Sequence, residues 1–175
     1  MEKDSQKNIL SSIGIILVRI DDRLIHGQVV VGWVRQYKIN QIIVSDDRAA
    51  KDSLQKNLME MAVADSEMEV SVLTTEETAD WILKKRFESR RSILLMSSPG
   101  EALRLLKIGV GLSVLNIGNL RYTDGCKQLT ESVFVNREGL LNFKELNQLG
   151  IRLEYQAAPD DAVVDLAQRL TPKLK

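Results

Sequence analysis

The sequence contains few of the residue types on which several classes of protein depend. Among its 175 residues there is one cysteine, Cys126, and one histidine, His26. A single cysteine cannot form an intramolecular disulfide, which favours a reducing compartment, and we expect no metal site built from Cys and His. Because 24 basic side chains are balanced by 24 acidic ones, the chain also lacks the basic excess typical of nucleic-acid binding.

Long hydrophobic runs are absent as well. The longest, such as Ile15–Val18 and Ile93–Met96, are far shorter than the roughly 20 residues that cross a bilayer. The first residues, MEKDSQKN, contain no apolar segment of the kind found in signal peptides. We therefore expect a cytoplasmic protein, with residues 1–14 as a flexible extension and residues 15–175 as a single domain.

Short runs rich in Val, Ile and Leu alternate with amphipathic stretches along the chain. Strands are predicted at Ile15–Ile20, Gln41–Ser45, Glu69–Leu73, Ser92–Ser97, Ser113–Ile117, Ser132–Val135 and Ile151–Gln156. Helices are predicted at Gln28–Tyr37, Ser53–Ala64, Glu76–Phe87, Pro99–Lys107, Arg137–Leu149 and Asp161–Leu170. Strands that are apolar throughout and followed by helices indicate a doubly wound α/β fold, with a mostly parallel sheet of about seven strands and helices on both faces.

Several residues mark the ends of these elements. The sequence Ser98-Pro99-Gly100-Glu101 combines a helix cap, a proline at the first helical position and a glutamate that can complete a capping box. Thr74 and Glu77 can form a second box, and Gly109 and Gly150 each follow a helix where a left-handed residue is favoured. Residues 121–128 show no helix pattern, which leaves open an antiparallel orientation for the strand at 132–135.

The loop after the first strand has the strongest concentration of reactive groups. In doubly wound sheets, ligands bind at the carboxyl ends of the strands, near the point where the strand order reverses. This loop reads Arg19-Ile20-Asp21-Asp22-Arg23-Leu24-Ile25-His26-Gly27-Gln28. His26 and Gly27 fall where the next helix begins, and a helix N-terminus holds anions through its free N–H groups and its dipole. Gly27 lets the backbone approach such an anion closely.

These residue types suit phosphoryl transfer through a histidine. A neutral imidazole is a competent nucleophile near neutral pH. Arg23 could supply a planar fork for the phosphate, and Arg19 could reach it if its side chain emerges near the strand end. Asp22 could hold the imidazole tautomer or orient Arg23. Taken alone, the pattern also fits a capping histidine with surface ion pairs.

The stretch Val18–Val30, with Trp33 following it, resembles the signature of the IIB components of the mannose/fructose/sorbose phosphotransferase family. Weaker similarity extends from about Ile15 to Leu170. The resemblance implies a histidine that accepts a phosphoryl group on Nδ1 from the IIA component and passes it to a sugar held by the membrane components IIC and IID. This role falls on His26, and that of the phosphate-facing arginine on Arg23.

The resulting hypothesis is a protein-N(pi)-phosphohistidine–sugar phosphotransferase that associates transiently with the inner face of the membrane. Its catalytic residues are His26, Arg23 and Asp22, and its phosphate-binding residues are Arg19, Arg23, Gly27 and Gln28. No cofactor or metal is implied, and the sequence is compatible with a homo-oligomer.

Three other classes of protein share parts of this pattern. A receiver-type domain would need an aspartate after the third strand, where Thr74 and Thr75 stand. A nucleotide-binding module would need a glycine-rich phosphate loop, and none follows the first strand. A non-catalytic interaction module fits the fold, and the pairing of His26 with Arg23 argues against it. The loop at residues 46–48, expected beside the first loop at the same sheet edge, is interpreted as a solvated turn that supplies charge to a helix N-terminus. The loop at residues 118–128 could close over the phosphate or meet a partner.

Overall fold

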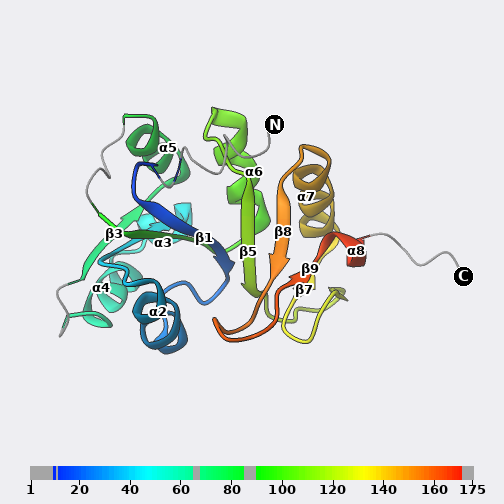
Figure 1. Cartoon of the computed structure of the whole chain (residues 1–175), viewed down its shortest axis with the longest axis horizontal. Coiled ribbons are helices and arrows are strands. Elements are labelled where there is room, and N and C mark those ends of the chain that lie inside the picture. The colour runs from blue at the N-terminus through cyan, green and yellow to red at the C-terminus, as the bar shows by residue number, and fades with distance from the viewer. Residues whose placement is uncertain (1–9, 11, 65–67, 85–89, 171–175) are drawn as a thin grey trace, which may run out of the picture.

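The structure is a computed structural model that describes residues 10, 12–64, 68–84 and 90–170. Its centre is a seven-stranded sheet in the order β3-β2-β4-β1-β5-β8-β9 (Figure 1). These strands are β1 (Ile15–Asp21), β2 (Gln41–Ser45), β3 (Glu69–Leu73), β4 (Ser92–Met96), β5 (Val114–Asn119), β8 (Arg152–Tyr155) and β9 (Val164–Asp165). The predicted doubly wound α/β class is confirmed, because all neighbours in this sheet pair in parallel except β8 and β9.

Strand prediction was accurate from the β3 edge across to β8 and wrong at the opposite edge of the sheet, beyond β8. The bounds of β2 and β3 are those predicted: the apolar run Ile42–Val44 marks β2, and the alternating Val70 and Val72 mark β3. The strand expected at 132–135 does not join the sheet: β7 (Phe134–Val135) pairs with β6 (Lys127–Gln128) in a separate antiparallel ribbon. The antiparallel edge strand is β9. It lies in a segment predicted to be helical, which is extended here because it pairs with β8.

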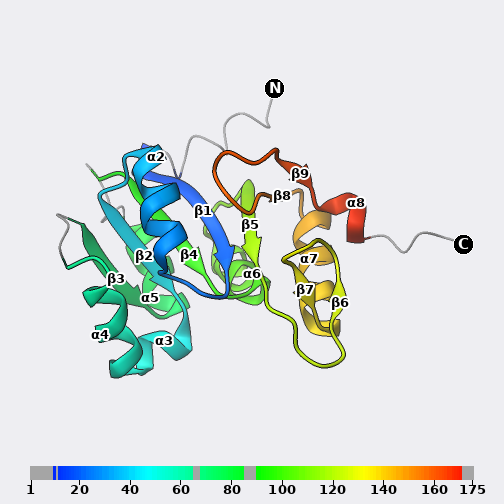
Figure 2. The ribbon, with the colours of Figure 1, turned by 90° about the horizontal axis from the view of Figure 1, so that it is seen from below.

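Helices cover both faces of the sheet (Figures 1 and 2). The described helices are η1 (Val29–Val34), α2 (Arg35–Tyr37), α3 (Asp47–Lys51), α4 (Ser53–Met61), α5 (Thr75–Leu83), α6 (Pro99–Ile108), α7 (Arg137–Gln148) and α8 (Ala167–Leu170). Residues of η1, α3 and α4 form one hydrophobic cluster with β2 and β4, whereas residues of α5, α6 and α7 form the other, larger cluster. The two sets of helices lie on opposite faces because right-handed crossovers that run in opposite directions along the sheet place their helices on opposite faces.

The predicted ends of several helices are observed. Glu77 accepts the backbone N–H of Thr74 at 2.8 Å, and Glu101 accepts that of Ser98 at 2.8 Å. Gly109 and Gly150 have φ values of +111° and +86°, which lie in the left-handed region that glycine adopts without strain.

The last predicted helix and the first residues differ from expectation. Helix α8 is confined to four residues because the chain before it is extended in β9. Within the expected flexible extension, Leu10 and Ile13 are buried in the larger core. Residues 1–9 and 11 of that extension lie outside the described residues.

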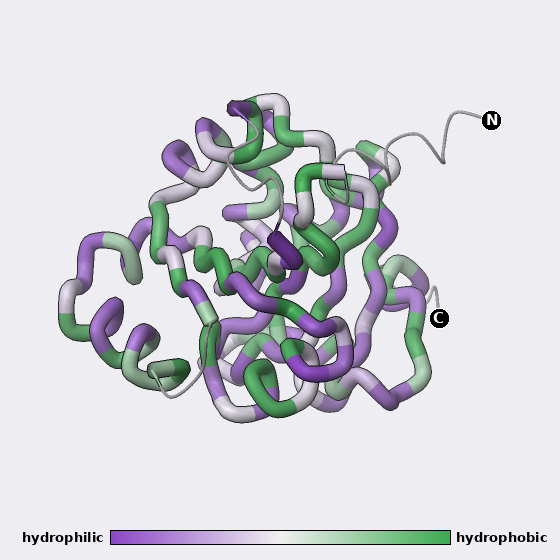
Figure 3. The backbone as a smooth tube through the Cα atoms, turned by 60° about the vertical axis from the view of Figure 1, so that its left-hand side comes forward, coloured by the Kyte–Doolittle hydropathy of each residue, from purple (hydrophilic) through white to green (hydrophobic). Residues whose placement is uncertain are grey.

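Hydropathy follows the same layering. Hydrophobic and hydrophilic segments alternate along the backbone in the hydropathy-coloured tube (Figure 3). β2 and β4 are buried at every position, as strands covered on both faces must be. In the described part of the chain, every helix falls short of the length and apolarity that a membrane crossing requires.

The strand order fixes where a site can form. β1 lies between β4 and β5, and the chain leaves β1 toward β2 on one side but leaves β5 toward β8 on the other. The carboxyl ends of β1 and β5 therefore flank the point at which the order reverses. His26 follows β1 at this edge.

Candidate functional site

A strained turn brings His26 back over the end of β1. Leu24 has a φ of +55°, a conformation that L-residues with large side chains rarely adopt. It is held there because its side chain is buried and its N–H donates to the carbonyl of Asp21 at 2.9 Å. The turn places His26 directly before the helix, where its carbonyl accepts the N–H groups of Val29 and Val30 at 3.0 and 3.1 Å. The helix continues as the π-helical segment η1, a form common at functional sites.

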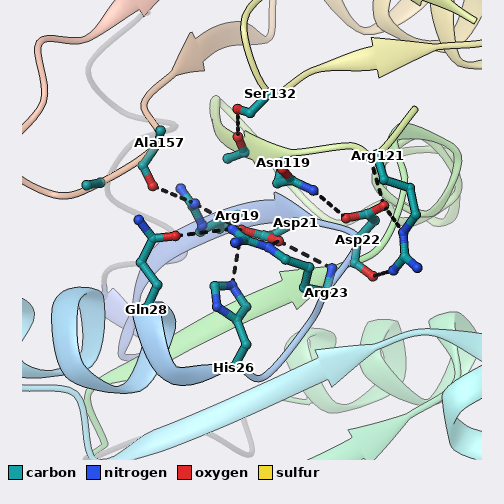
Figure 4. A network of polar contacts seen from close by, with 12 residues as sticks. Arg19, Asp21, Asp22, Arg23, His26, Gln28, Asn119, Arg121, Ser132 and Ala157 are labelled. Atoms are coloured by element: carbon teal, nitrogen blue, oxygen red, sulfur yellow. Dashed lines mark hydrogen bonds and ion pairs between the residues drawn. The ribbon is translucent and has the colours of Figure 1, made fainter.

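Asp21 is the centre of the site (Figure 4). Its side chain is fully buried, and Oδ2 lies 3.4 Å from Nε2 of His26. Arg23 approaches the same carboxylate as a fork, with Nε 2.8 Å from Oδ1 and Nη2 2.8 Å from Oδ2. Arg19 donates from Nη2 to Oδ2 at 3.0 Å.

These donors keep Asp21 ionised. Burial acts to raise its pKa, but the hydrogen bonds from His26 and Arg23 and the charge of Arg19 outweigh burial and hold that pKa well below its ordinary value. An ionised carboxylate can only accept hydrogen bonds, so the contact with Asp21 requires the proton of a neutral His26 ring to be on Nε2. Nδ1 is then left with its lone pair, on a side chain that is 18% exposed.

Asp22 lies on the other side of the strand. The sequence predicted that Asp22 would hold the imidazole tautomer or orient Arg23, and the structure assigns both contacts to Asp21 instead. Asp22 accepts from Asn119 at 2.8 Å and from Nε of Arg121 at 2.7 Å. The reason is the alternation of side chains along β1, which sends Arg19 and Asp21 to the face covered by η1 and the next residue away from it.

Arg19 is buried, contrary to the expectation that it would extend toward a phosphate. Its guanidinium lies over Trp33, with Cζ 4.5 Å from the ring centroid. It donates to the Asn116 side chain and to the carbonyls of Gln156 and Ala157, the latter two at 3.0 and 3.2 Å. With 0% of the side chain exposed, Arg19 contacts the site through its ion pair with Asp21.

The remaining predicted residues are at the surface. Arg23 is 38% exposed, and its Nη2 also donates to Oε1 of Gln28 at 3.2 Å. A Cβ added to Gly27 would meet no atom within 4 Å, so the space beside this residue is open. Arg23, His26, Gly27 and Gln28 thus lie together at one surface.

The two neighbouring loops differ from expectation in part. At 46–48, Asp46 is buried rather than solvated. It accepts the N–H groups of Arg48 and Ala49 and caps α3, which agrees with the expected charge at a helix N-terminus, although the helix was predicted to begin only at Ser53. In the 118–128 loop, the Asp22–Arg121 ion pair ties the chain after β5 to the loop of His26. A cavity of about 980 Å³ lies beside this ion pair; Asp22 and Leu24 line it, and His26 does not.

Sequence reasoning missed Asp21, the strained Leu24 and the partners of Arg19. For Asp21 a signal was present, because strand alternation groups it with Arg19. Asn116 lies on β5 and Gln156 directly follows β8, about 100 and 140 residues after Arg19 in the sequence. Only the pairing of these strands in the sheet brings the two residues to Arg19.

Fold and site together define a class: a doubly wound α/β protein whose single histidine lies, partly exposed, at the switch point of the sheet. The family model described as "PTS system sorbose subfamily IIB component" matches residues 15–175. The chain therefore belongs to the sorbose subfamily of IIB components of the sugar phosphotransferase system, which confirms the resemblance seen in the sequence.

Individual relatives support this assignment along nearly the whole chain. The chain is 38% identical to the N-acetylgalactosamine-specific phosphotransferase enzyme IIB component 2 of Escherichia coli (strain K12), over 89% of this chain and 98% of the relative. It is 33% identical to the fructose-specific EIIB component of Bacillus subtilis (strain 168), over 90% and 96% respectively. The crystal structure of the IIBSor domain of the sorbose permease from Klebsiella pneumoniae superposes with a TM-score of 0.82 at 31% identity, covering 89% of this chain and 95% of that one.

Proposed function

We propose that His26 carries a phosphoryl group from the IIA component to a sugar held by the membrane components IIC and IID. The observation that carries this proposal is the contact between Nε2 of His26 and the buried, ionised Asp21, which leaves Nδ1 as the nucleophile. Asp21 also favours the positive charge that the ring acquires as the new bond forms.

In the first step, Nδ1 of His26 attacks the phosphorus of the phosphohistidine of IIA. The new N–P bond forms as the donor N–P bond breaks, and the electron pair of the broken bond returns to the donor ring. In the second step, a sugar hydroxyl attacks the phosphorus, its proton passes to a base beside the sugar, and Nδ1 recovers its lone pair. Both steps rely mainly on alignment and on donors around the phosphoryl oxygens.

The residues beside the ring supply those donors. Arg23 is partly exposed and can offer its planar fork to two phosphoryl oxygens. The N–H groups at the start of the helix, at Gly27 and Gln28, lack intrahelical partners and suit a third oxygen. The protein would work in the cytoplasm and meet the membrane only while its partners are bound.

The test is to incubate the protein with the phosphorylated IIA partner and to locate the label. One acid-labile, alkali-stable phosphoryl group on Nδ1 of His26 is expected, and none in His26→Ala. Label on a serine, threonine or aspartate, or full labelling of His26→Ala, would overturn the proposal.

A further inference from the structure

The two arginines at Asp21 differ in every respect that bears on movement. Arg19 is fully buried and donates to four oxygens from β1, β5 and the segment after β8. Arg23 is 38% exposed, and its partners are Asp21 and the exposed Gln28. The guanidinium of Arg19 is therefore held in place by the core, whereas that of Arg23 can move from Asp21 to another anion.

A phosphoryl group on His26 would compete with Asp21 for the guanidinium of Arg23. Before transfer, two guanidiniums face one carboxylate, so the group carries one positive charge in excess. The incoming group brings close to two negative charges. If Arg23 turns toward it, Asp21 loses the fork that holds it and would remain as a buried carboxylate beside an anion, an arrangement that raises its pKa and favours its protonation.

We propose that Arg19 is a positioning residue: the permanent counter-charge that keeps Asp21 ionised and bound to Nε2 while Arg23 is engaged by the phosphoryl group. This inference rests on the proposed function of His26. It replaces the expected phosphate-binding role of Arg19 with a role exerted through Asp21.

The residues around Arg19 hold its guanidinium in place beside Asp21. Trp33 stacks on one face of the guanidinium, at 4.5 Å, and excludes water from it. On β5, a Cβ at Gly118 would overlap the guanidinium and lie 2.8 Å from Oδ2 of Asp21. A glycine at this position leaves the space that the Arg19–Asp21 pair occupies, and the carbonyls of Gln156 and Ala157 close the remaining side.

The experiment uses potassium phosphoramidate as phosphoryl donor, because it needs no partner protein. Since His26 is the only histidine, ³¹P and ¹⁵N spectra report the phosphorylated fraction and the ring nitrogen that carries it. The ¹³C shift of the Asp21 carboxyl, compared before and after labelling, reports its protonation. The variants are Arg19→Gln, which keeps donors but no charge, Arg19→Lys, which keeps the charge, and Arg19→Met, with Arg152→Met as the control on an exposed ion pair.

In the wild-type protein and in Arg152→Met, Asp21 should stay ionised at neutral pH after labelling. In Arg19→Gln and Arg19→Met, the ratio of phosphorylated to free protein should fall about tenfold or more, and Asp21 should take up a proton on labelling. Arg19→Lys should recover part of the ratio and keep Asp21 ionised, because a compact ammonium restores the charge but not the fork. A purely structural arginine would not couple the protonation of Asp21 to the label.

A wild-type ratio in Arg19→Gln, with Asp21 ionised after labelling, would overturn the inference. If Arg19→Met does not fold, the Arg19→Gln and Arg19→Lys pair decides the question. If the wild-type protein takes no label on Nδ1 of His26, the proposed function itself fails. Label at that atom in all variants at equal extent would reject only the role of Arg19.

Discussion

At the scale of single residues, the proposed reactivity of His26 depends on which neighbouring carboxylate contacts its ring. Asp21 and Asp22 are adjacent in sequence, yet only Asp21 is fully buried and in contact with Nε2. Asp22, in the turn after β1, is bound instead to Asn119 and Arg121. Two chemically identical side chains thus have different consequences because of strand alternation.

Asp21→Asn and Asp22→Asn should therefore behave differently. Asp21→Asn leaves the buried Arg19 without its counter-charge, so the free energy of unfolding should fall by about 3 kcal/mol. The proton of His26 should also no longer be fixed on Nε2. Urea denaturation and ¹⁵N spectra of the single histidine measure both effects.

Asp22→Asn is the matched control. It loses an ion pair with the exposed Arg121, worth at most about 1 kcal/mol, and should leave the tautomer unchanged. A change of tautomer in Asp22→Asn, with none in Asp21→Asn, would contradict the assignment.

Arg23 should act mainly by stabilising the transition state of phosphoryl transfer. Arg23→Ala should slow phosphoryl transfer from phosphorylated IIA by a factor on the order of 10² while leaving the fold intact. Arg23→Lys should recover only part of the rate because the bidentate fork is lost. Quenched-flow measurements of the transfer rate compare these variants with the wild type, and Arg152→Ala is the control. Equal rates for Arg23→Ala and wild type would reduce this residue to a surface ion pair.

At the scale of secondary-structure elements, the helices beyond the site are joined by a buried polar cluster. Asp46 at the start of α3 accepts the hydroxyl of Ser97, which lies after β4. The same hydroxyl lies 3.3 Å from both carboxylate oxygens of Glu101 in the first turn of α6. Burial first, and the nearby charge of Asp46 second, raise the pKa of Glu101 to about 7.

This cluster predicts a pH dependence of stability. Because folding raises the pKa of Glu101 above its ordinary value of 4.5, its contribution to stability is full below about pH 4.5 and is lost as the pH rises through about 7. The groups that face it are Asp46, Ser97 and Ser98, and Arg104 one turn along α6 interacts with it through its charge.

Glu101→Gln should flatten the dependence. Between pH 5 and pH 8, its free energy of unfolding should fall by about 2 kcal/mol less than that of the wild type. Glu138→Gln, in the exposed first turn of α7, is the control and should follow the wild-type curve. Parallel curves for Glu101→Gln and wild type in chemical denaturation would show that the cluster does not titrate in this range.

At the scale of the whole molecule, the imidazole lies at the surface and not in an enclosed cavity. His26 is partly exposed beside η1, and it does not line the cavity of about 980 Å³ that Asp22 and Leu24 line. A residue that meets a phosphoryl donor and then an acceptor needs access for both. Such alternating contacts are expected to be modest in area and quickly released.

We therefore expect no free sugar to bind at this site. A sugar ring needs several hydrogen-bonding groups, since each buried hydroxyl left unpaired costs about 1–3 kcal/mol. Calorimetric titration with fructose, sorbose and N-acetylgalactosamine should show no heat of binding. Sugar phosphate should form only when membranes with the cognate IIC and IID components are added to phosphorylated protein. Sugar phosphate formed without membranes would indicate an acceptor site in this chain.

The sequence by itself determined the local parts of this protein. The interior strands follow from continuous apolar runs, and the caps at Thr74 and Ser98 follow from spacings of three residues, because both depend on neighbours in the chain. The grouping of Arg23, His26 and Gly27 is local for the same reason: a short loop leads into a helix.

Tertiary structure decided the rest. The edge strand β9 and the ribbon of β6 and β7 are two residues each, too short for a pattern, and they exist through pairing with distant partners. The burial of Arg19 depends on Asn116 and Gln156, which β5 and β8 bring against β1. Whether a charged side chain faces solvent or the core depends on these long-range contacts, because only they replace the hydration that a buried charge loses.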